Sequence, residues 1–214
     1  GFHLYDPEYI NAPVLLGNGA MAYDYEKNEV IFNDAIGEEG LEVVNDILAN
    51  FPDVPIEFYN INKVCAVNIN EHSEHHFTSQ DIDFHNVESP EEAPLPWTKV
   101  MIAAHGCSKE VQEILEKHPE VNYLKTTGDY VEILKKGVDK GTGLLRLSEA
   151  LGITPENVYA AGDGYNDVEM LIAAKGGFVP ENGSTEALSV ADYVTRSNND
   201  GCISHVIEIL DELY

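Results

Sequence analysis

The stretch Val158–Leu171 constrains the fold of this chain most strongly, because a short apolar run changes there into a helical pattern through a polar turn. Residues 158–161 form the apolar run, which is typical of a buried β-strand. The helical spacing after the turn is formed by Val168, Met170, Leu171 and Ala174. The turn itself contains Gly162, Asp163, Gly164, Asn166 and Asp167. In an open α/β sheet, such a strand–turn–helix junction lies at the edge where ligands bind.

The three polar residues of this turn are suited to a hard divalent cation and a phosphate group. Asp163 and Asp167 supply two carboxylates, and Mg²⁺ prefers one or two carboxylates together with water and phosphate oxygens. Asn166 can donate to a phosphate oxygen without adding negative charge. The same residue types are common in turns and helix caps, but one cap needs only one such residue. Tyr165 stands where an EF-hand calcium loop requires an oxygen ligand, which excludes that kind of site.

Lys140 is a further candidate site residue, since it stands at the predicted N-terminus of a helix beside Gly141 and Gly143. The exposed N–H groups and the helix dipole favour an anion at such an end. A lysine there opposes the dipole, so helix stability does not explain it, whereas a phosphate between Lys140 and the amides does. The alternative is an exposed surface lysine, and both interpretations remain open.

Strands and helices alternate regularly after Gly137. A helix carrying Leu144, Leu147 and Leu151 precedes the strand at 158–161. The pattern then predicts a helix at 168–174, a strand at 177–179, a helix at 185–190, a strand at 193–195 and a helix at 203–213. This alternation implies a parallel sheet with helices on both of its faces.

The earlier part of the chain has a different character. Residues 13–16 predict a strand that ends at Gly17-Asn18-Gly19, and residues 21–32 predict a hairpin. The run from Gly17 to Ala22 matches the dinucleotide-binding fingerprint in letters, but the helix that this fingerprint requires is missing. Further strands are predicted at 56–60, 63–70, 100–104, 121–126 and 130–134, and helices at 40–50 and after Ser108 as N-cap.

Residues 71–98 are acidic and contain several prolines and histidines, and we expect an irregular stretch or poorly patterned helices there. His72, His75 and His76 have a spacing that can bind a transition metal. Without a helical frame to hold the rings on one face, the sequence favours a solvated loop over a metal site.

The chain is strongly acidic, since 12 basic residues against 38 acidic ones give a formal net charge of −26. This charge argues against nucleic acid or an anionic membrane surface as a partner, because both repel it. The three cysteines are far apart, so neither a disulfide framework nor a zinc site is indicated, and a reducing cytoplasm is expected. No apolar run approaches the length of a transmembrane helix, and residues 1–15 lack the pattern of a signal peptide.

Two motifs of this chain, at residues 137–141 and 162–171, resemble motifs III and IV of the haloacid dehalogenase superfamily. The likeness is to Cof-type phosphatases with a large α/β cap of class IIB, and residues 191–201 and 13–24 also resemble parts of those proteins. The resemblance implies an α/β fold with a Rossmann-like core, built on a parallel sheet, and an inserted α/β cap. The core would comprise residues 1–21 and 137–214, and the cap residues 22–136.

The resemblance also implies roles for four residues. Asp163 would bind Mg²⁺, and Asp167 would support that metal site directly or through a neighbouring group. Lys140 would hold the phosphoryl group, and Asn166 would contact phosphate. The family's reaction forms an aspartyl-phosphate, with a second aspartate as acid and base, and Mg²⁺ and lysine stabilise the transferred group electrostatically. The implied activity is Mg²⁺-dependent hydrolysis of small phosphorylated metabolites such as sugar phosphates.

The chain departs from the family pattern near its N-terminus. The nucleophile motif Asp-x-Asp-x-Thr is not present, and the one Asp-x-Asp, Asp81-Ile82-Asp83, lies within the predicted cap. We therefore expect that the first βαβ unit, about 50 residues, is missing, and that the 214 residues alone are inactive. Two alternatives stay open: a non-catalytic phosphate- or metal-binding relative, and a sugar phosphomutase on the same scaffold. The sequence predicts neither the particular substrate nor the oligomeric state.

Overall fold

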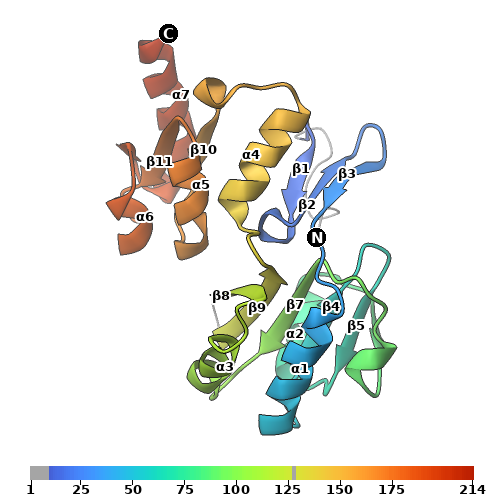
Figure 1. The fold of residues 1–214 in the computed structure, drawn as a ribbon. Helices are drawn as coiled ribbons and strands as arrows, with labels where there is room; N and C mark the ends of the chain where they lie inside the picture. The colour runs from blue at the N-terminus through green and yellow to red at the C-terminus, as the bar shows by residue number, and fades with distance from the viewer. Residues whose placement is uncertain (1–9, 127–128) are drawn as a thin grey trace. The chain divides into compact units, whose positions relative to one another are not determined.

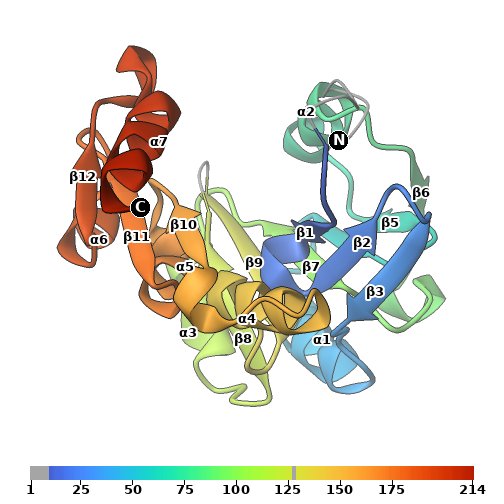
Figure 2. The same cartoon turned by 90° about the horizontal axis from the view of Figure 1, so that it is seen from above.

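The computed structural model describes residues 10–126 and 129–214, and the chain divides into two compact units (Figures 1 and 2). The first unit comprises Gly1–Val138 and the second unit Asp139–Tyr214. The assignment of residues 1–21 to one domain with residues 137–214 stays a prediction, and its residues 1–9 lie outside the described part of the chain.

The larger sheet of the first unit has six strands in the order β6-β5-β4-β7-β9-β8. All neighbours in it are antiparallel except β5 and β6, which run parallel. Its strands are β4 (Ile56–Tyr59), β5 (Val64–Val67), β6 (Phe84–Asn86), β7 (Lys99–Ala103), β8 (Val121–Lys125) and β9 (Tyr130–Lys135). Five of these strands were predicted from periodicity. The short β6 was not, because its three residues show too little alternation to identify a strand.

One face of this sheet is apolar and is covered by helices α1 (Glu39–Asn50) and α3 (Ser108–Leu115). Alternate strand residues point toward the helices, as the period of a strand requires. Trp97 is fully buried in this core, where its ring lies 4.6 Å from that of Phe58 and its Nε1–H donates to the carbonyl of Ala93. Burial of these side chains is the main stabilising contribution to the first unit.

The first unit also contains a three-stranded antiparallel sheet, in the order β1-β2-β3. It contains β1 (Val14–Leu16), β2 (Met21–Asp24) and β3 (Glu29–Asn33). The turn before β2 places Gly17, Asn18 and Gly19 at positive φ, which favours glycine at its ends. The β2–β3 turn is closed by the carboxylate of Asp24, which accepts from the backbone N–H groups of Glu26 and Lys27. The predicted hairpin is therefore confirmed.

The histidine-rich segment contains a helix, α2 (Glu71–Ser79), so the predicted solvated loop for His72, His75 and His76 was wrong. Asn70 caps this helix by accepting from two backbone N–H groups, and the Ser73 hydroxyl completes the capping box. The third helical residue of a capping box is usually glutamate or glutamine. Here it is Ser73, so the sequence does not match the usual capping-box pattern. The cap is what starts a helix that has little apolar periodicity.

The second unit contains three parallel strands in the order β10-β11-β12, and the predicted alternation of strands and helices is confirmed. Leu171, Val179 and Ala187 form a small core within it. Helices α5 and α6 connect the strands, as right-handed crossovers between parallel strands commonly do. The elements are α4 (Lys140–Ala150), β10 (Tyr159–Ala161), α5 (Val168–Ala173), β11 (Gly176–Pro180), α6 (Thr185–Ser189), β12 (Tyr193–Thr195) and α7 (Cys202–Leu213).

The N-terminus of α3 differs in detail from the expectation. Cys107 is the N-cap residue and Ser108 the first helical residue, and the Cys107 side chain accepts no hydrogen bond from the first turn of this helix. The Ser108 hydroxyl instead accepts from the side-chain amide of Gln112. The predicted N-cap role of Ser108 was therefore wrong by one residue, which is the usual uncertainty at a helix end.

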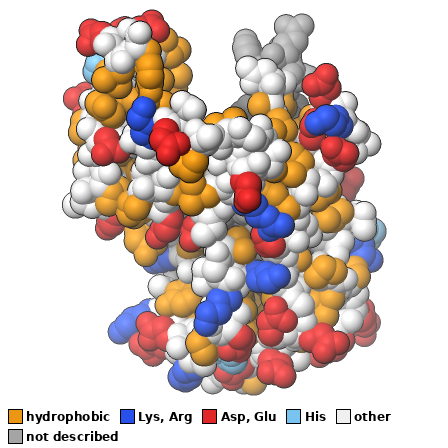
Figure 3. Space-filling view, turned by 45° about the horizontal axis from the view of Figure 1, so that its top comes forward, with side chains coloured by type: hydrophobic (Ala, Val, Ile, Leu, Met, Phe, Trp, Pro, Cys, Tyr) orange, Lys and Arg blue, Asp and Glu red, His pale blue; other side chains and the backbone are white. Residues whose placement is uncertain are grey.

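Acidic side chains are spread over the face of the molecule drawn in Figure 3. Any anionic ligand therefore needs local positive charge or N–H donors at its site to overcome this field. Among the described residues, no helix combines the length and apolar character needed to span a bilayer.

Candidate active site

The N-terminus of α4 is held against α5 within the second unit. Asp139 caps α4 by accepting from the backbone N–H of Thr142, and the Thr142 hydroxyl accepts in return from the backbone N–H of Asp139. A Cβ at Gly141 would lie 2.4 Å from the carbonyl oxygen of Glu169, so only glycine permits this approach. The close contact places Lys140, the first helical residue, beside the turn before α5.

The turn after β10 is equally tight. A Cβ at Gly162 would lie 2.5 Å from the Cβ of Asp167, which explains the glycine at the start of the turn. A 3-10 turn over Tyr165–Asp167 then leads directly into α5. The turn thereby directs the side chain of Asp167 back toward the end of the strand.

Asp167 joins the two helix ends. Its Oδ1 accepts from the Lys140 ammonium at 2.6 Å, and its Oδ2 accepts from the backbone N–H groups of Asp163 and Gly164 at 3.0 and 2.9 Å. The residue is 6% exposed. Burial acts to raise the pKa of Asp167, but the hydrogen bond and charge of Lys140 and the two N–H donors outweigh it, so the pKa lies below its usual value.

The other two predicted site residues lie on the same turn. Asp163 is exposed, and within the described part of the chain no group donates to its carboxylate. Its backbone is fixed, since its N–H donates to Asp167 and its carbonyl accepts from the N–H of Ser184 at 2.8 Å. Asn166 is half-buried at the following 3-10 turn. The structure thus brings Lys140, Asp163, Asn166 and Asp167 to one end of the parallel sheet.

This donor set suits a hard cation only in part. The Asp163 carboxylate is available to a metal, whereas both oxygens of Asp167 already accept from protein donors. Within residues 10–126 and 129–214, no group of three His, Cys, Asp or Glu side chains is placed to hold a metal ion. Mg²⁺ binds with few carboxylates when water and phosphate complete its octahedron, so one free carboxylate fits a shared Mg²⁺–phosphate site.

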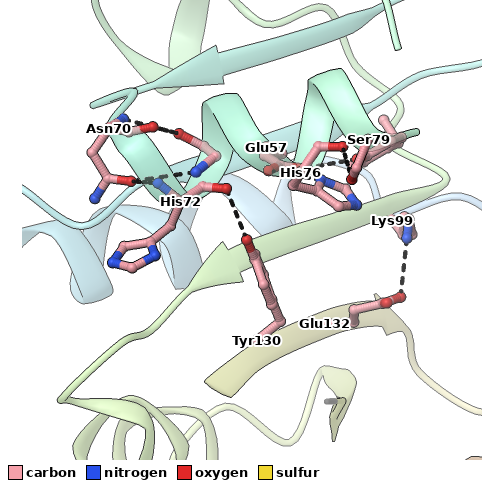
Figure 4. A network of polar contacts seen from close by, with 10 residues as sticks. Glu57, Asn70, His72, His76, Ser79, Lys99, Tyr130 and Glu132 are labelled. Carbon is pink, nitrogen blue, oxygen red and sulfur yellow. Dashed lines mark hydrogen bonds and ion pairs between the residues drawn. The ribbon is translucent and has the colours of Figure 1, made fainter. Parts of the chain in front are cut away.

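A second polar cluster, which the sequence did not indicate, lies on the face of the six-stranded sheet opposite α1 and α3 (Figure 4). Glu57, Met101 and Glu132 are in register across β4, β7 and β9. The buried Glu57 accepts from the Tyr59 hydroxyl at 2.6 Å and lies 3.0 Å from Nδ1 of His76. Burial, and then the charge of Glu57, raise the pKa of Tyr59 far above its usual value.

The other carboxylate of this cluster is held from two directions. Glu132 accepts from the Asn18 side-chain amide at 2.8 Å and pairs with the Lys99 ammonium at 3.3 Å. The Lys99 ammonium also lies 4.7 Å from the centre of the Tyr59 ring. These contacts satisfy the buried carboxylates, as burial requires. They join residues far apart in the sequence, which is why no local motif revealed them.

The fold agrees with the comparison to known families. The sequence profile of the haloacid dehalogenase-like hydrolases matches residues 3–207. The chain belongs to this haloacid dehalogenase-like hydrolase family. The predicted membership and fold class are therefore confirmed.

Individual relatives support the same assignment. The chain is 26% identical over 206 residues to “Putative phosphatase YxeH” of Bacillus subtilis (strain 168). This match covers 92% of this chain and 75% of the relative. It is 40% identical over 88 residues to a phosphoglycolate phosphatase of Methanopyrus kandleri, a match that covers 41% of this chain and 38% of the relative.

Solved structures also resemble this one. The HAD subclass IIB sugar phosphatase BT4131 superposes with a TM-score of 0.79 and 22% identity, covering 91% of this chain and 74% of that one. TM0651 from Thermotoga maritima superposes with a TM-score of 0.76 and 27% identity, covering 94% and 78%. The likeness to BT4131 concerns the fold.

Proposed function

We propose that the intact protein is a Mg²⁺-dependent phosphatase of small phosphorylated metabolites such as sugar phosphates. The observation that carries this proposal is the pairing of Lys140 with the buried Asp167 at the turn that also presents Asp163. A cation, a free carboxylate and an amide side chain at one sheet edge match what phosphoryl transfer needs. The names of several relatives, which are phosphatases, point in the same direction.

In this proposal Lys140 binds the phosphoryl oxygens and neutralises the charge that builds during transfer. Asp167 fixes the direction of the Lys140 side chain and keeps the turn in place through Asp163 and Gly164. Asn166 donates to a phosphate oxygen. Positioning before the reaction is what makes such charges effective, because no reorganisation is needed as the reaction proceeds.

The resident metal in this proposal is Mg²⁺, and Asp163 is its ligand, with Asp167 supporting the metal site. When bound, Mg²⁺ would polarise the phosphoryl group and offset its negative charge. The strongly acidic surface makes this assistance necessary for an anionic substrate. The motif Asp-x-Asp-x-Thr, which would supply the phosphoryl-accepting aspartate and its acid–base partner, is not among the 214 residues, so we propose that these residues alone are inactive.

The substrate class is proposed from the relatives. BT4131 is a sugar phosphatase, and the Methanopyrus kandleri relative is a phosphoglycolate phosphatase. Both names point to a small phosphorylated substrate. Pockets that bind small molecules carry only a few polar groups, which fix the orientation of the ligand. We also place the protein in the cytoplasm, since none of its three cysteines forms a disulfide.

The test is phosphate release by the intact protein with a panel of sugar phosphates and phosphoglycolate. Lys140→Met is expected to lower kcat/KM by about 10²-fold or more, since it removes the cation that faces developing charge. Lys109→Met, at an exposed lysine on α3, is the matched control and is expected to leave the rate unchanged. Tight binding of phosphate esters without turnover by the wild-type protein would instead favour the non-catalytic alternative, and equal rates for both variants would remove Lys140 from the site.

A further inference from the structure

The first unit contains a pocket of about 380 Å³ that the proposed phosphatase site does not use. Its walls come from three separate segments of the chain: the end of α1 with the following loop, the start of α2, and the β7–α3 connection. The polar side chains among its lining residues are Asn50, Asp53, Asn70, His72, His105 and Cys107. A pocket of this volume lies within the range that holds small metabolites.

Hydrogen bonds hold the loop that forms one wall of this pocket. The loop between α1 and β4 is held by the Asn68 side-chain amide, which donates to the carbonyls of Pro52 and Val54 at 2.7 and 3.1 Å. The backbone N–H of Ala103 donates to the carbonyl of Pro55 at the base of the same loop. Preformed walls of this kind reduce the entropy that a ligand must overcome on binding.

Two histidines form one side of the pocket. The rings of His72 and His105 are stacked with their centres 3.9 Å apart and an angle of 18° between their planes. Tyr130 supports this pair, since its ring lies edge-on to His105 and its hydroxyl donates to the backbone carbonyl of His72 (Figure 4). The stack therefore joins α2 to the β7–α3 connection at a fixed position.

The pair also contains an unsatisfied group. Nε2 of His105 is buried and has no hydrogen-bond partner among the described residues. A buried polar atom without a partner is destabilising, and native structures rarely retain one without a reason. His105 is itself one of the residues that line the pocket, so a ligand that enters there and turns the ring toward it can satisfy this nitrogen.

The chemistry around the pocket favours an oxyanion over a metal ion. Burial, and then the charge of Glu110, raise the pKa of the Cys107 thiol, so it remains a neutral, weak donor. No three metal-binding side chains are suitably placed within the described part of the chain. Donors predominate instead: the imidazoles, the Asn70 amide, whose oxygen is already engaged by the α2 cap, and the uncapped N-terminus of α3.

We propose that this pocket binds a small oxyanion, such as a phosphate or a carboxylate of metabolite size, through His105 and His72. The charged groups near the pair are Asp53 in the loop wall, exposed at the rim, and Glu71, whose carboxylate lies 4.0 Å from Nε2 of His72. Both oppose an anion, so the attraction must come from the N–H donors of the imidazoles and of the Asn70 amide.

The test follows the imidazole nitrogens of the intact protein by long-range ¹H–¹⁵N NMR during a titration with inorganic phosphate, and separately with citrate. We expect saturable shifts of the His72 and His105 signals, while His118 on the α3–β8 connection serves as an internal reference. The two probes distinguish phosphate from carboxylate recognition. Absence of saturable shifts with both probes would show that the pocket holds only water and would overturn the proposal.

Variants locate the binding. His105→Gln is expected to weaken phosphate binding at this site at least tenfold, whereas His85→Gln, at an exposed histidine on β6, leaves it unchanged. The same titration in Lys140→Met separates this pocket from the proposed phosphatase site, because the histidine shifts persist there even if catalysis is lost. Equal binding by His105→Gln and the wild type would overturn the proposal, and the wild-type titration decides the matter if that variant does not fold.

Discussion

The Lys140 ammonium lies 2.6 Å from Oδ1 of Asp167 and joins the start of α4 to the turn that precedes α5. The other oxygen of Asp167 holds the backbone of Asp163 and Gly164. One buried carboxylate therefore fixes both the proposed phosphate-binding cation and the proposed metal ligand. Charge-assisted hydrogen bonds of this length are the strong ones in proteins.

Replacing Asp167 by Asn is expected to lower phosphate release by the intact protein by about 10²-fold, because Lys140 and the turn both lose their fixed partner. The folded state should lose about 1–3 kcal/mol, since a buried charge-assisted bond is removed. Steady-state kinetics and chemical denaturation measure the two effects. Glu169→Gln, at an exposed carboxylate on α5, is the control and should change neither; unchanged kinetics in Asp167→Asn would contradict the positioning role.

The same carboxylate gives a pH dependence. The pKa of Asp167 is depressed in the folded protein, so its contribution to stability is complete above the unfolded value of about 3.9. That contribution is lost as the pH falls through the lower, folded pKa. The difference in unfolding free energy between wild type and Asp167→Asn should therefore be constant near neutrality and shrink in acid. A difference that grows on acidification would refute the assigned direction.

Gly141→Ala is predicted to destabilise the second unit by about 2 kcal/mol or more. Alanine is the better helix former by about 1 kcal/mol, so the loss must come from contact with the Glu169 carbonyl oxygen, which would lie 2.4 Å from the added Cβ. Thermal unfolding checks this prediction. Leu145→Ala, on the exposed side of α4, is the comparison and should cost less than about 1 kcal/mol. A stabilised Gly141→Ala protein would show that α4 and α5 are not so closely packed.

Much of the candidate site was predictable because its signals are local. Lys140, Asp163, Asn166 and Asp167 stand within two short motifs, and the strands and helices around them follow clear periodicities. The sequence did not reveal which of the two aspartates has its carboxylate hydrogen-bonded by other groups of the protein. Only the structure shows that the carboxylate of Asp167 accepts a hydrogen bond from Lys140, whereas Asp163 is exposed.

Features built from distant residues were not predictable in the same way. Glu57 looks like an ordinary polar residue of a strand, and its partner His76 lies 19 positions away on a helix that sequence patterning missed. Glu132 is held by Asn18, which is 114 positions away. Such pairs depend on how the sheet assembles, so no short window contains them.

His118 provides a second pH-dependent contribution, within the first unit. Its Nε2 lies 3.0 Å from Asp46 on α1 and its Nδ1 lies 2.7 Å from Glu120. Burial acts to lower the pKa of His118, but the hydrogen bonds and charges of these carboxylates outweigh it, so the pKa is raised.

Because the folded pKa is raised, the stabilisation by His118 is complete below the unfolded value of about 6.5 and is lost as the pH rises through the folded pKa. His118→Gln should therefore lose up to about 1 kcal/mol at low pH and less above neutrality. Urea denaturation across this range measures the difference, with His85→Gln on β6 as the exposed control. A loss that increases with pH would contradict the assigned ion pairs.

The most direct test of the phosphatase account measures phosphate release by the intact protein as a function of Mg²⁺ concentration, in wild type and in Asp163→Asn. We expect chelation to abolish wild-type activity and Mg²⁺ to restore it, and we expect the activity of Asp163→Asn to be lower by about 10²-fold or to require much more Mg²⁺. Glu169→Gln should behave as wild type. Wild-type rates and an unchanged Mg²⁺ response in Asp163→Asn would contradict the account and remove the metal site from this turn.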